Sequence, residues 1–218
     1  MKRAVILLFT ACLALGAPAA AKKKLVLAPV GTSTNIADFL PPPITADNTW
    51  NLDLSDGGRV VIQLRPDKAP LMVARVKELS RQGFYNGLIF HRYSPGFVVQ
   101  GGGYGPSTNG LLPPPKPASA PINYEAGGGS NLQWTVAMAR TQALNSATSQ
   151  FFINMADNSL LDAAPYGPYA VFASVDAGSV PLVQSITSAP CVLDPTDLPA
   201  GDCLPAPNIV ITSATQTQ

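Results

Sequence analysis

Apolar and polar residues alternate in several short stretches that are separated by turn residues. Residues 49–54 (TWNLDL) and 59–64 (RVVIQL) lie on either side of the turn sequence SDGG, which predicts a β-hairpin. Six further apolar stretches are typical of short strands: residues 88–92, 96–102, 132–139, 149–155, 169–175 and 208–214. The pattern therefore predicts about eight strands.

Two stretches have helical spacing instead. In residues 69–83, Leu71, Val73, Ala74, Val76 and Leu79 share one helix face, a proline stands near the start and a glycine follows the end. Residues 180–186 predict a second, shorter helix. Because helices and strands do not alternate, a parallel α/β sheet is not expected. We expect a mainly β fold: a closed eight-stranded antiparallel barrel, which has no open edge, capped by two α-helices.

The N-terminus has the pattern of a secretory signal. A basic start, an apolar run and small residues precede Lys22, which predicts cleavage of residues 1–21 and a periplasmic or secreted location. The run is too short for a stable membrane span. An alternative is a lipoprotein-type cleavage that leaves Cys12 as a lipid anchor. Residues 22–48 then form a leader or linker, and residues 49–218 form one domain.

Charge, proline content and cysteine content each bear on the class of protein. The formal net charge is +1 and charged residues make up 12% of the chain, so nothing indicates nucleic-acid binding. Prolines cluster around residues 41–43 and 111–121, which predicts rigid loops whose role the sequence leaves open. Removal of the signal leaves Cys191 and Cys203, which in an exported chain predict a disulfide, with two free thiols as the alternative.

Two segments carry the candidate chemistry: FHRYSPGFVVQGGG (residues 90–103) and AMARTQALNSATSQFFIN (residues 137–154). Neither supplies a serine–histidine–acid set or a metal-ligand cluster. The glycines at 101–103 follow a strand, but no helix pattern and no Lys-Ser/Thr pair follow them, which argues against a phosphate loop. No metal and no cofactor are expected.

With their flanking residues, these two segments resemble cyclophilin-type peptidyl-prolyl cis-trans isomerases, particularly the exported bacterial branch. The resemblance extends from about residue 50 to residue 212. It implies the barrel with two helices, a site on the barrel's outer face, and proline-containing peptide segments of unfolded or exported proteins as partners. We also expect a monomer.

The resemblance assigns site residues one by one. Arg92 falls on the family's catalytic arginine, with Phe97 and Gln100 beside it. The residues that fall on the proline pocket, its rim and the stretch that holds the substrate backbone are Val98, Ala139, Arg140, Gln150, Phe152, Leu161 and Tyr169. Gln100 and Gln150 are expected to orient Arg92 and the substrate without cancelling the arginine charge.

The sequence departs from the family at three of these positions and at Leu160. Val98 stands where many members have methionine, Arg140 where asparagine is common, and Tyr169 where histidine is frequent. Leu160 stands where tryptophan is frequent and removes an indole N–H donor, so we expect weak binding of cyclosporin.

Structural roles compete with functional ones at several residues. His91 is the only histidine in the chain and is expected to face away from Arg92, because neighbours on a strand point to opposite faces. The same alternation predicts one of Phe151 and Phe152 in the core and the other, Phe152, in the groove. Asp157 and Asp162 are interpreted as caps of a turn.

The sequence therefore predicts an enzyme that accelerates rotation about X-Pro bonds in exported proteins. A non-catalytic proline-peptide binding module, or a holdase chaperone that uses the same groove, is the alternative from another class. A small-ligand barrel of the lipocalin type is disfavoured, because such barrels do not carry these two segments.

Overall fold

The computed structural model describes residues 48–193 and 198–216. The expected signal sequence, Cys12 and nearly all of the leader lie outside the described residues. The described part contains ten strands and two α-helices. The strands are β1 (Thr49–Leu54), β2 (Arg59–Leu64), β3 (Phe90–Ser94), β4 (Val98–Gly101), β5 (Thr135–Met138), β6 (Phe151–Asn154), β7 (Val171–Val175), β8 (Cys191–Leu193), β9 (Cys203–Pro205) and β10 (Ile211–Gln216), and the helices are α1 (Pro70–Arg81) and α2 (Val180–Ser188).

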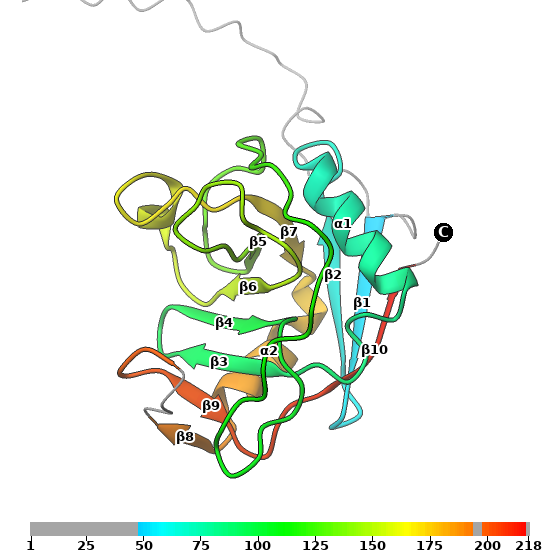
Figure 1. The fold of residues 1–218 in the computed structure, drawn as a ribbon, viewed down its shortest axis with the longest axis vertical. Coiled ribbons are helices and arrows are strands. Elements are labelled where there is room, and N and C mark those ends of the chain that lie inside the picture. The colour runs from blue at the N-terminus through cyan, green and yellow to red at the C-terminus, as the bar shows by residue number, and fades with distance from the viewer. Residues whose placement is uncertain (1–47, 194–197, 217–218) are drawn as a thin grey trace, which may run out of the picture. The chain divides into compact units, whose positions relative to one another are not determined.

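All strand pairs in the described part are antiparallel, and the strands form one sheet in the order β10-β1-β2-β7-β5-β6-β4-β3-β9-β8 (Figure 1). The mainly β, antiparallel prediction with two helices is confirmed, and each of the predicted strands is present. The strands β8 and β9 were not predicted, because three residues each are too few for an alternating pattern. The ladder ends at β10 and β8, so closure of the sheet into a barrel stays a prediction.

Helix α1 has the predicted extent, and most of its predicted buried face is confirmed. Val73, Val76 and Leu79 are buried as expected. Assigning Leu71 and Ala74 to this face was wrong, since both are exposed, and Met72 is buried in addition. Within residues 48–193 and 198–216, neither α-helix has the length and apolar character that a bilayer span requires.

Aromatic rings fill the centre of the core. Trp50 lies with its ring centroid 4.9 Å from that of Phe151 and 5.3 Å from that of Tyr85, and all three side chains are fully buried. Burial raises the pKa of the Tyr85 hydroxyl, which donates a hydrogen bond to the carbonyl of Ser149. This core fixes the strands whose opposite face carries the site.

The predicted disulfide is present between Cys191 and Cys203, with the two Cα atoms 5.7 Å apart. It joins β8 to β9 as a two-stranded hairpin. Strand β9 pairs with β3 through Cys203 and Tyr93, so the hairpin extends the sheet beside the strand that carries Arg92.

Candidate active site

A β-bulge in β3 directs Arg92 to the outer face of the sheet. Phe90 pairs with Gly101 and Arg92 pairs with Gln100, so two steps along β3 match one step along β4. In a regular strand Phe90 and Arg92 would share a face. The bulge separates them, since Phe90 is fully buried in the core while Arg92 reaches the surface groove.

The groove is built on one row of residues that crosses four strands. Arg92 on β3 pairs with Gln100 on β4, Gln100 pairs with Phe152 on β6, and Phe152 pairs with Ala137 on β5. Directly opposed side chains on one face of a sheet lie about 4.5–5.5 Å apart at Cβ. Strand register alone therefore places the guanidinium, the amide and the ring side by side.

Beside this row lies a hollow of about 150 Å³. Its lining residues are Arg92, Phe97, Val98, Gln100, Ala139, Arg140, Phe152, Leu161 and Tyr169. Every one of them is a predicted site residue, so the structure brings together nine of the ten residues that the sequence singled out. The tenth, Gln150, lines an adjoining hollow of about 140 Å³ together with Gln100 and Arg140.

A chain of hydrogen bonds holds the polar side of the groove. Nη1 of Arg92 donates to Oε1 of Gln100 at 3.0 Å, and Nε2 of Gln100 donates to Oε1 of Gln150 at 2.9 Å. The orientation of the arginine by the two glutamines is thus present in the geometry. The two glutamine amides are neutral, but a carboxylate that was not predicted from the sequence pairs with the arginine charge: Nε of Arg92 donates to Oδ2 of Asp202 at 2.5 Å.

The other side of the groove is apolar. Val98, Phe152 and Leu161 are buried in a small cluster of their own, separate from the main core, and Phe97 packs against it. Two donors fix the backbone of Phe97 by binding its carbonyl: the amide N–H of Met155 and the Asn158 side chain, both at 2.8 Å. The pocket wall is therefore held by the backbone and does not depend on packing alone.

Arg140 and Tyr169 form the far rim of the hollow. The Arg140 guanidinium lies over the Tyr169 ring at 4.7 Å from its centroid, and donates to the carbonyls of Pro168 and Thr141 at 2.8 and 2.9 Å. Ala139 donates its backbone N–H to the carbonyl of Gln150 at 2.9 Å. Arg140 is thus committed to the protein backbone, and Ala139 lines the hollow beside it.

The glycines that suggested a phosphate loop have a packing role. Gly102 has a φ of +82°, and a Cβ there would lie 3.0 Å from the Phe151 ring. A Cβ on Gly103 would lie 2.5 Å from Gln150. Side chains at these positions would displace a core ring and a groove glutamine, which explains the run of glycines beside the site.

His91 is structural, as predicted, and the two acids also have structural contacts, but they do not cap the turn between them: their carboxylates bind residues 130–133. His91 is 2% exposed and lies with its ring centroid 4.6 Å from that of Tyr104, away from the groove. Burial, with a smaller contribution from the charge of Arg92, lowers the pKa of His91 to about 3. Asp157 accepts from the backbone N–H of Gln133 at 2.9 Å.

Asp162 supports the short 3-10 helix Ser159–Asp162, which carries Leu161 to the pocket. Its carboxylate accepts from the Ser130 hydroxyl and, at 2.8 and 2.9 Å, from the backbone and side chain of Asn131. Burial tends to raise the pKa of this carboxyl, but the hydrogen bonds outweigh it, so the pKa lies below its usual value. Asp157 and Asp162 therefore form no catalytic carboxylate pair.

The sequence matches the model of the cyclophilin type peptidyl-prolyl cis-trans isomerase/CLD family over residues 49–216. The chain belongs to this family. It is 41% identical to peptidyl-prolyl cis-trans isomerase A of Dickeya dadantii over 158 residues, which cover 71% of this chain and 80% of that protein. It is 44% identical to peptidyl-prolyl cis-trans isomerase B of Escherichia coli over 126 residues, which cover 56% of this chain and 74% of that protein.

The fold is also that of cyclophilins. A crystal structure of a Cryptosporidium parvum cyclophilin type peptidyl-prolyl cis-trans isomerase, determined in the presence of the dipeptide Ala-Pro, matches with a TM-score of 0.60. The match covers 78% of this chain and 99% of that chain at 18% sequence identity. The mainly β antiparallel sheet with two helices is thus cyclophilin-like.

Two buried side chains that support this cyclophilin-type site were not predicted from the sequence. Asn158 holds Phe97 and Asp202 holds Arg92, and both side chains are buried. Asp202 is 110 residues away from Arg92 and outside the two segments that carry the resemblance. The closest signal was its place next to Cys203, since a disulfide hairpin fixes the residues around it, but no spacing rule links that hairpin to β3.

Proposed function

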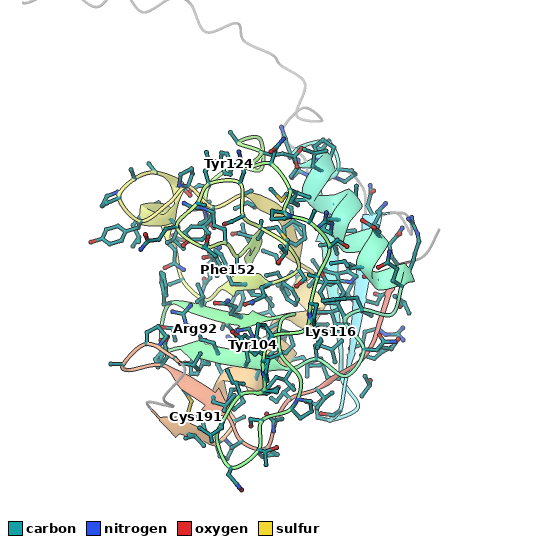
Figure 2. All side chains as sticks on the ribbon, in the orientation of Figure 1. Arg92, Tyr104, Lys116, Tyr124, Phe152 and Cys191 are labelled. Carbon is teal, nitrogen blue, oxygen red and sulfur yellow. A yellow bond between two sulfur atoms is a disulfide. The ribbon has the colours of Figure 1, made fainter. Side chains whose placement is uncertain are left out.

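We propose that this cyclophilin-type domain accelerates rotation about X-Pro bonds in exported protein chains, through Arg92 and an apolar pocket for the proline ring. The observation that carries the proposal is the position of Arg92. Its guanidinium is held by Gln100 at the edge of a hollow that Phe152 also lines; Figure 2 labels Arg92 and Phe152.

The reaction suits a site that has no nucleophile. Rotation about an X-Pro bond faces a barrier of about 18–20 kcal/mol because resonance gives the bond partial double-bond character. The cis and trans forms differ by only about 0.5–1 kcal/mol, and no covalent bond is made or broken. The site has to hold the proline ring, leave the preceding residue free to turn, and bind the twisted state more tightly than either planar state.

The pocket of Phe97, Val98, Phe152 and Leu161 holds the ring. These side chains offer apolar surface on several sides of a hollow with room for one small ring. Valine in place of methionine keeps the wall apolar but shortens its reach. The main chain at Ala139 and the amide of Gln150 hold the substrate backbone beside it.

Arg92 favours the twisted state. As the bond twists, the imide nitrogen regains a lone pair, and a guanidinium N–H can donate near it or to the prolyl carbonyl. A hydrogen bond from a charged donor contributes about 1.5–3 kcal/mol, and about 1.4 kcal/mol changes a rate tenfold. Arg92 then supplies about ten- to a hundredfold, and positioning in a partly dry groove supplies the remainder.

The protein acts outside the cytoplasm, on exported proteins. The signal pattern over residues 1–21 favours the periplasm or the exterior, and a disulfide between Cys191 and Cys203 suits an oxidising compartment. Cleavage that leaves Cys12 as a lipid anchor is the alternative. Intact-mass analysis of the mature protein distinguishes the two N-termini.

Three further properties belong to the proposal. The protein acts as a monomer. It binds cyclosporin weakly because Leu160, which is 50% exposed, offers no indole N–H. The sheet closes into a barrel through the bridge between Ile89 and Val210, where Phe90 donates to the carbonyl of Ile209 at 3.1 Å and Ile211 donates to that of Leu88 at 2.7 Å.

A protease-coupled assay on an Ala-Pro-Phe peptide tests the function, since the protease cleaves only the trans form. We expect the wild-type protein to speed the slow phase, and Arg92→Ala to lower kcat/KM by about ten- to a hundredfold. Arg59→Ala is the matched control, because Arg59 makes a similar ion pair with Asp53 away from the groove. A wild-type rate equal to background would favour a non-catalytic binding module or holdase.

A further inference from the structure

Asp202 is a buried carboxylate in contact with the guanidinium of the groove. Its side chain is 5% exposed, and its Oδ2 accepts from Nε of Arg92 at 2.5 Å. Arg92 is itself 21% exposed at the side chain, so the pair sits at the edge of the groove and is partly shielded from water. A carboxylate removed from water in this way is stable only when it is paired, so each partner constrains the other.

Asp202 belongs to the disulfide hairpin and to no part of the groove itself. It directly precedes Cys203, whose sulfur is bonded to Cys191 and whose backbone pairs with Tyr93, the neighbour of Arg92. The Asp202 backbone N–H donates to the carbonyl of Pro199 at 3.1 Å. In Figure 2, Arg92 lies between Phe152 of the groove and Cys191 of the hairpin.

The two partners hold Arg92 at different nitrogens. Asp202 binds Nε and Gln100 binds Nη1, so the two contacts are made at separate nitrogens of the guanidinium. One contact leaves the guanidinium plane free to swing, whereas two contacts at different nitrogens fix the plane. A long side chain loses substantial rotamer freedom when it is ordered, so fixing it before the substrate binds favours the twisted state.

We propose that Asp202 is a positioning residue for Arg92, and that the Cys191–Cys203 hairpin is the element that holds Asp202 at the groove. The inference rests on the proposed function, since positioning matters only if Arg92 acts in rotation. Asp202 touches Arg92 and lines neither hollow of the groove, so it acts through the arginine.

The test is Asp202→Asn, which keeps the size of the side chain and removes its charge. We expect kcat for the Ala-Pro-Phe peptide to fall by about three- to tenfold with KM within about twofold of the wild-type value. Asp53→Asn is the matched control, because Asp53 accepts from Nε of Arg59 at 2.6 Å on a strand outside the groove. This control is expected to leave both constants unchanged.

A double mutant separates positioning from a general effect on the fold. Once Arg92 is alanine, Asp202→Asn should change kcat/KM by less than about twofold, because Asp202 has no other route to the reaction. In nitrogen-edited NMR spectra, the Nε–Hε signal of Arg92 should be slow to exchange in the wild type and lost or shifted in Asp202→Asn. An additive loss in the double mutant, or an unchanged or faster kcat in Asp202→Asn, overturns the inference.

The hairpin is tested by replacing both Cys191 and Cys203 with serine. We expect kcat to fall to about the level of Asp202→Asn, and adding Asp202→Asn to the serine pair to change it by less than about twofold. A wild-type kcat in the serine pair would refute the role of the hairpin. If Asp202→Asn does not fold, the serine pair alone tests the inference. An inactive wild-type protein would instead refute the proposed function, so the two failures are distinguishable.

Discussion

The two faces of strands β4 and β6 carry similar apolar residues, but one face packs in the core and the other lines the groove. On the inner face, Val99, Phe151 and Ile153 are fully buried within a large core built around Trp50. On the outer face, Val98 and Phe152 belong to a small cluster that borders a hollow of about 150 Å³. The inner face is filled by the protein itself, whereas the outer face leaves apolar surface for a ring that the protein does not supply.

The inner face stabilises the fold, and the outer face carries the candidate site. Protein interiors are close-packed, so a core side chain is held by neighbours on all sides. The groove side chains are held by strand register, by backbone contacts and by the chain from Asp202 through Arg92 and Gln100 to Gln150. Substitutions on the inner face should therefore change unfolding, and substitutions on the outer face should change the reaction.

The largest effect is expected from the adjacent pair Phe151 and Phe152. Phe151→Ala should lower the free energy of unfolding by about 3–5 kcal/mol, because it opens a cavity against Trp50 and Tyr85. Phe152→Ala should be less destabilising, and should lower kcat/KM by about tenfold, mainly through KM, because the ring loses a wall. Chemical denaturation and the peptide assay on both variants provide the comparison, and equal effects on both properties would break it.

Next in size is Arg92→Lys, which keeps the charge. A lysine has one nitrogen and cannot reproduce contacts with Asp202 and Gln100 at two separate nitrogens while still offering a donor to the substrate. We expect kcat to fall by about tenfold, with stability closer to the wild-type value than that of Arg92→Ala, in which Asp202 is left unpaired. If Arg92→Lys retains wild-type kcat, the planar fork is unnecessary and charge alone suffices.

Gln100→Leu should have a smaller effect. It removes one hydrogen bond to Arg92 and one to Gln150, and leaves the contact with Asp202 in place. A hydrogen bond from a charged donor contributes about 1.5–3 kcal/mol, but Asp202 still holds Arg92 in the variant, so we expect kcat to fall by only about three- to tenfold. Gln82→Leu, at an exposed glutamine that contacts Glu78, is the control and should leave kcat unchanged.

The smallest effect on the reaction is expected from His91. Its pKa is about 3 in the folded protein against 6.5 for an ordinary histidine, so only the unfolded chain takes up this proton between those values. The free energy of unfolding should therefore fall by up to about 1.4 kcal/mol per pH unit as the pH drops below about 6.5. At pH 7 and above the histidine is neutral in both states and contributes no slope.

The measurement is denaturation between pH 7 and 4 for the wild type and for His91→Phe, which keeps a ring beside Tyr104. The variant should show a shallower loss of stability with falling pH. The kcat/KM of both proteins should stay within about twofold of each other and show no step near pH 6–7. A step in the wild type that the variant lacks would place His91 in the reaction.

Alternation and turn chemistry predicted most of the fold. The hairpin of β1 and β2 and the split between Phe151 and Phe152 follow from the period of two along a strand. The bulge at His91 could not be predicted, because it depends on how β3 meets β4 and leaves no mark in composition. On helix α1, Val73, Val76 and Leu79 were assigned correctly, but Leu71 was wrongly included and Met72 was left out, because the sheet beneath the helix decides which neighbouring apolar residues face inward.

For the site, resemblance identified residues that chemistry alone would not have chosen. In the sequence, Gln100 and Gln150 are ordinary polar residues. In the structure, Gln100 is hydrogen-bonded to Arg92, and Gln150 is hydrogen-bonded to Gln100. The contact of Asp202 with Arg92 was not predicted, because the two residues are 110 positions apart and the location of Asp202 depends on a disulfide hairpin of very short strands. Long-range contacts of this kind have no local pattern in the sequence.

In the proposed mechanism, the apolar wall binds the proline ring and Arg92 promotes rotation of the bond. Exchange NMR spectroscopy on an Ala-Pro peptide tests it, because binding appears as shifted peptide resonances and rotation appears as exchange between the cis and trans signals. We expect cis–trans exchange with the wild-type protein, and in Arg92→Ala a similar Kd with exchange slowed by about ten- to a hundredfold. Undiminished exchange in Arg92→Ala, or binding without exchange in the wild type, would contradict it.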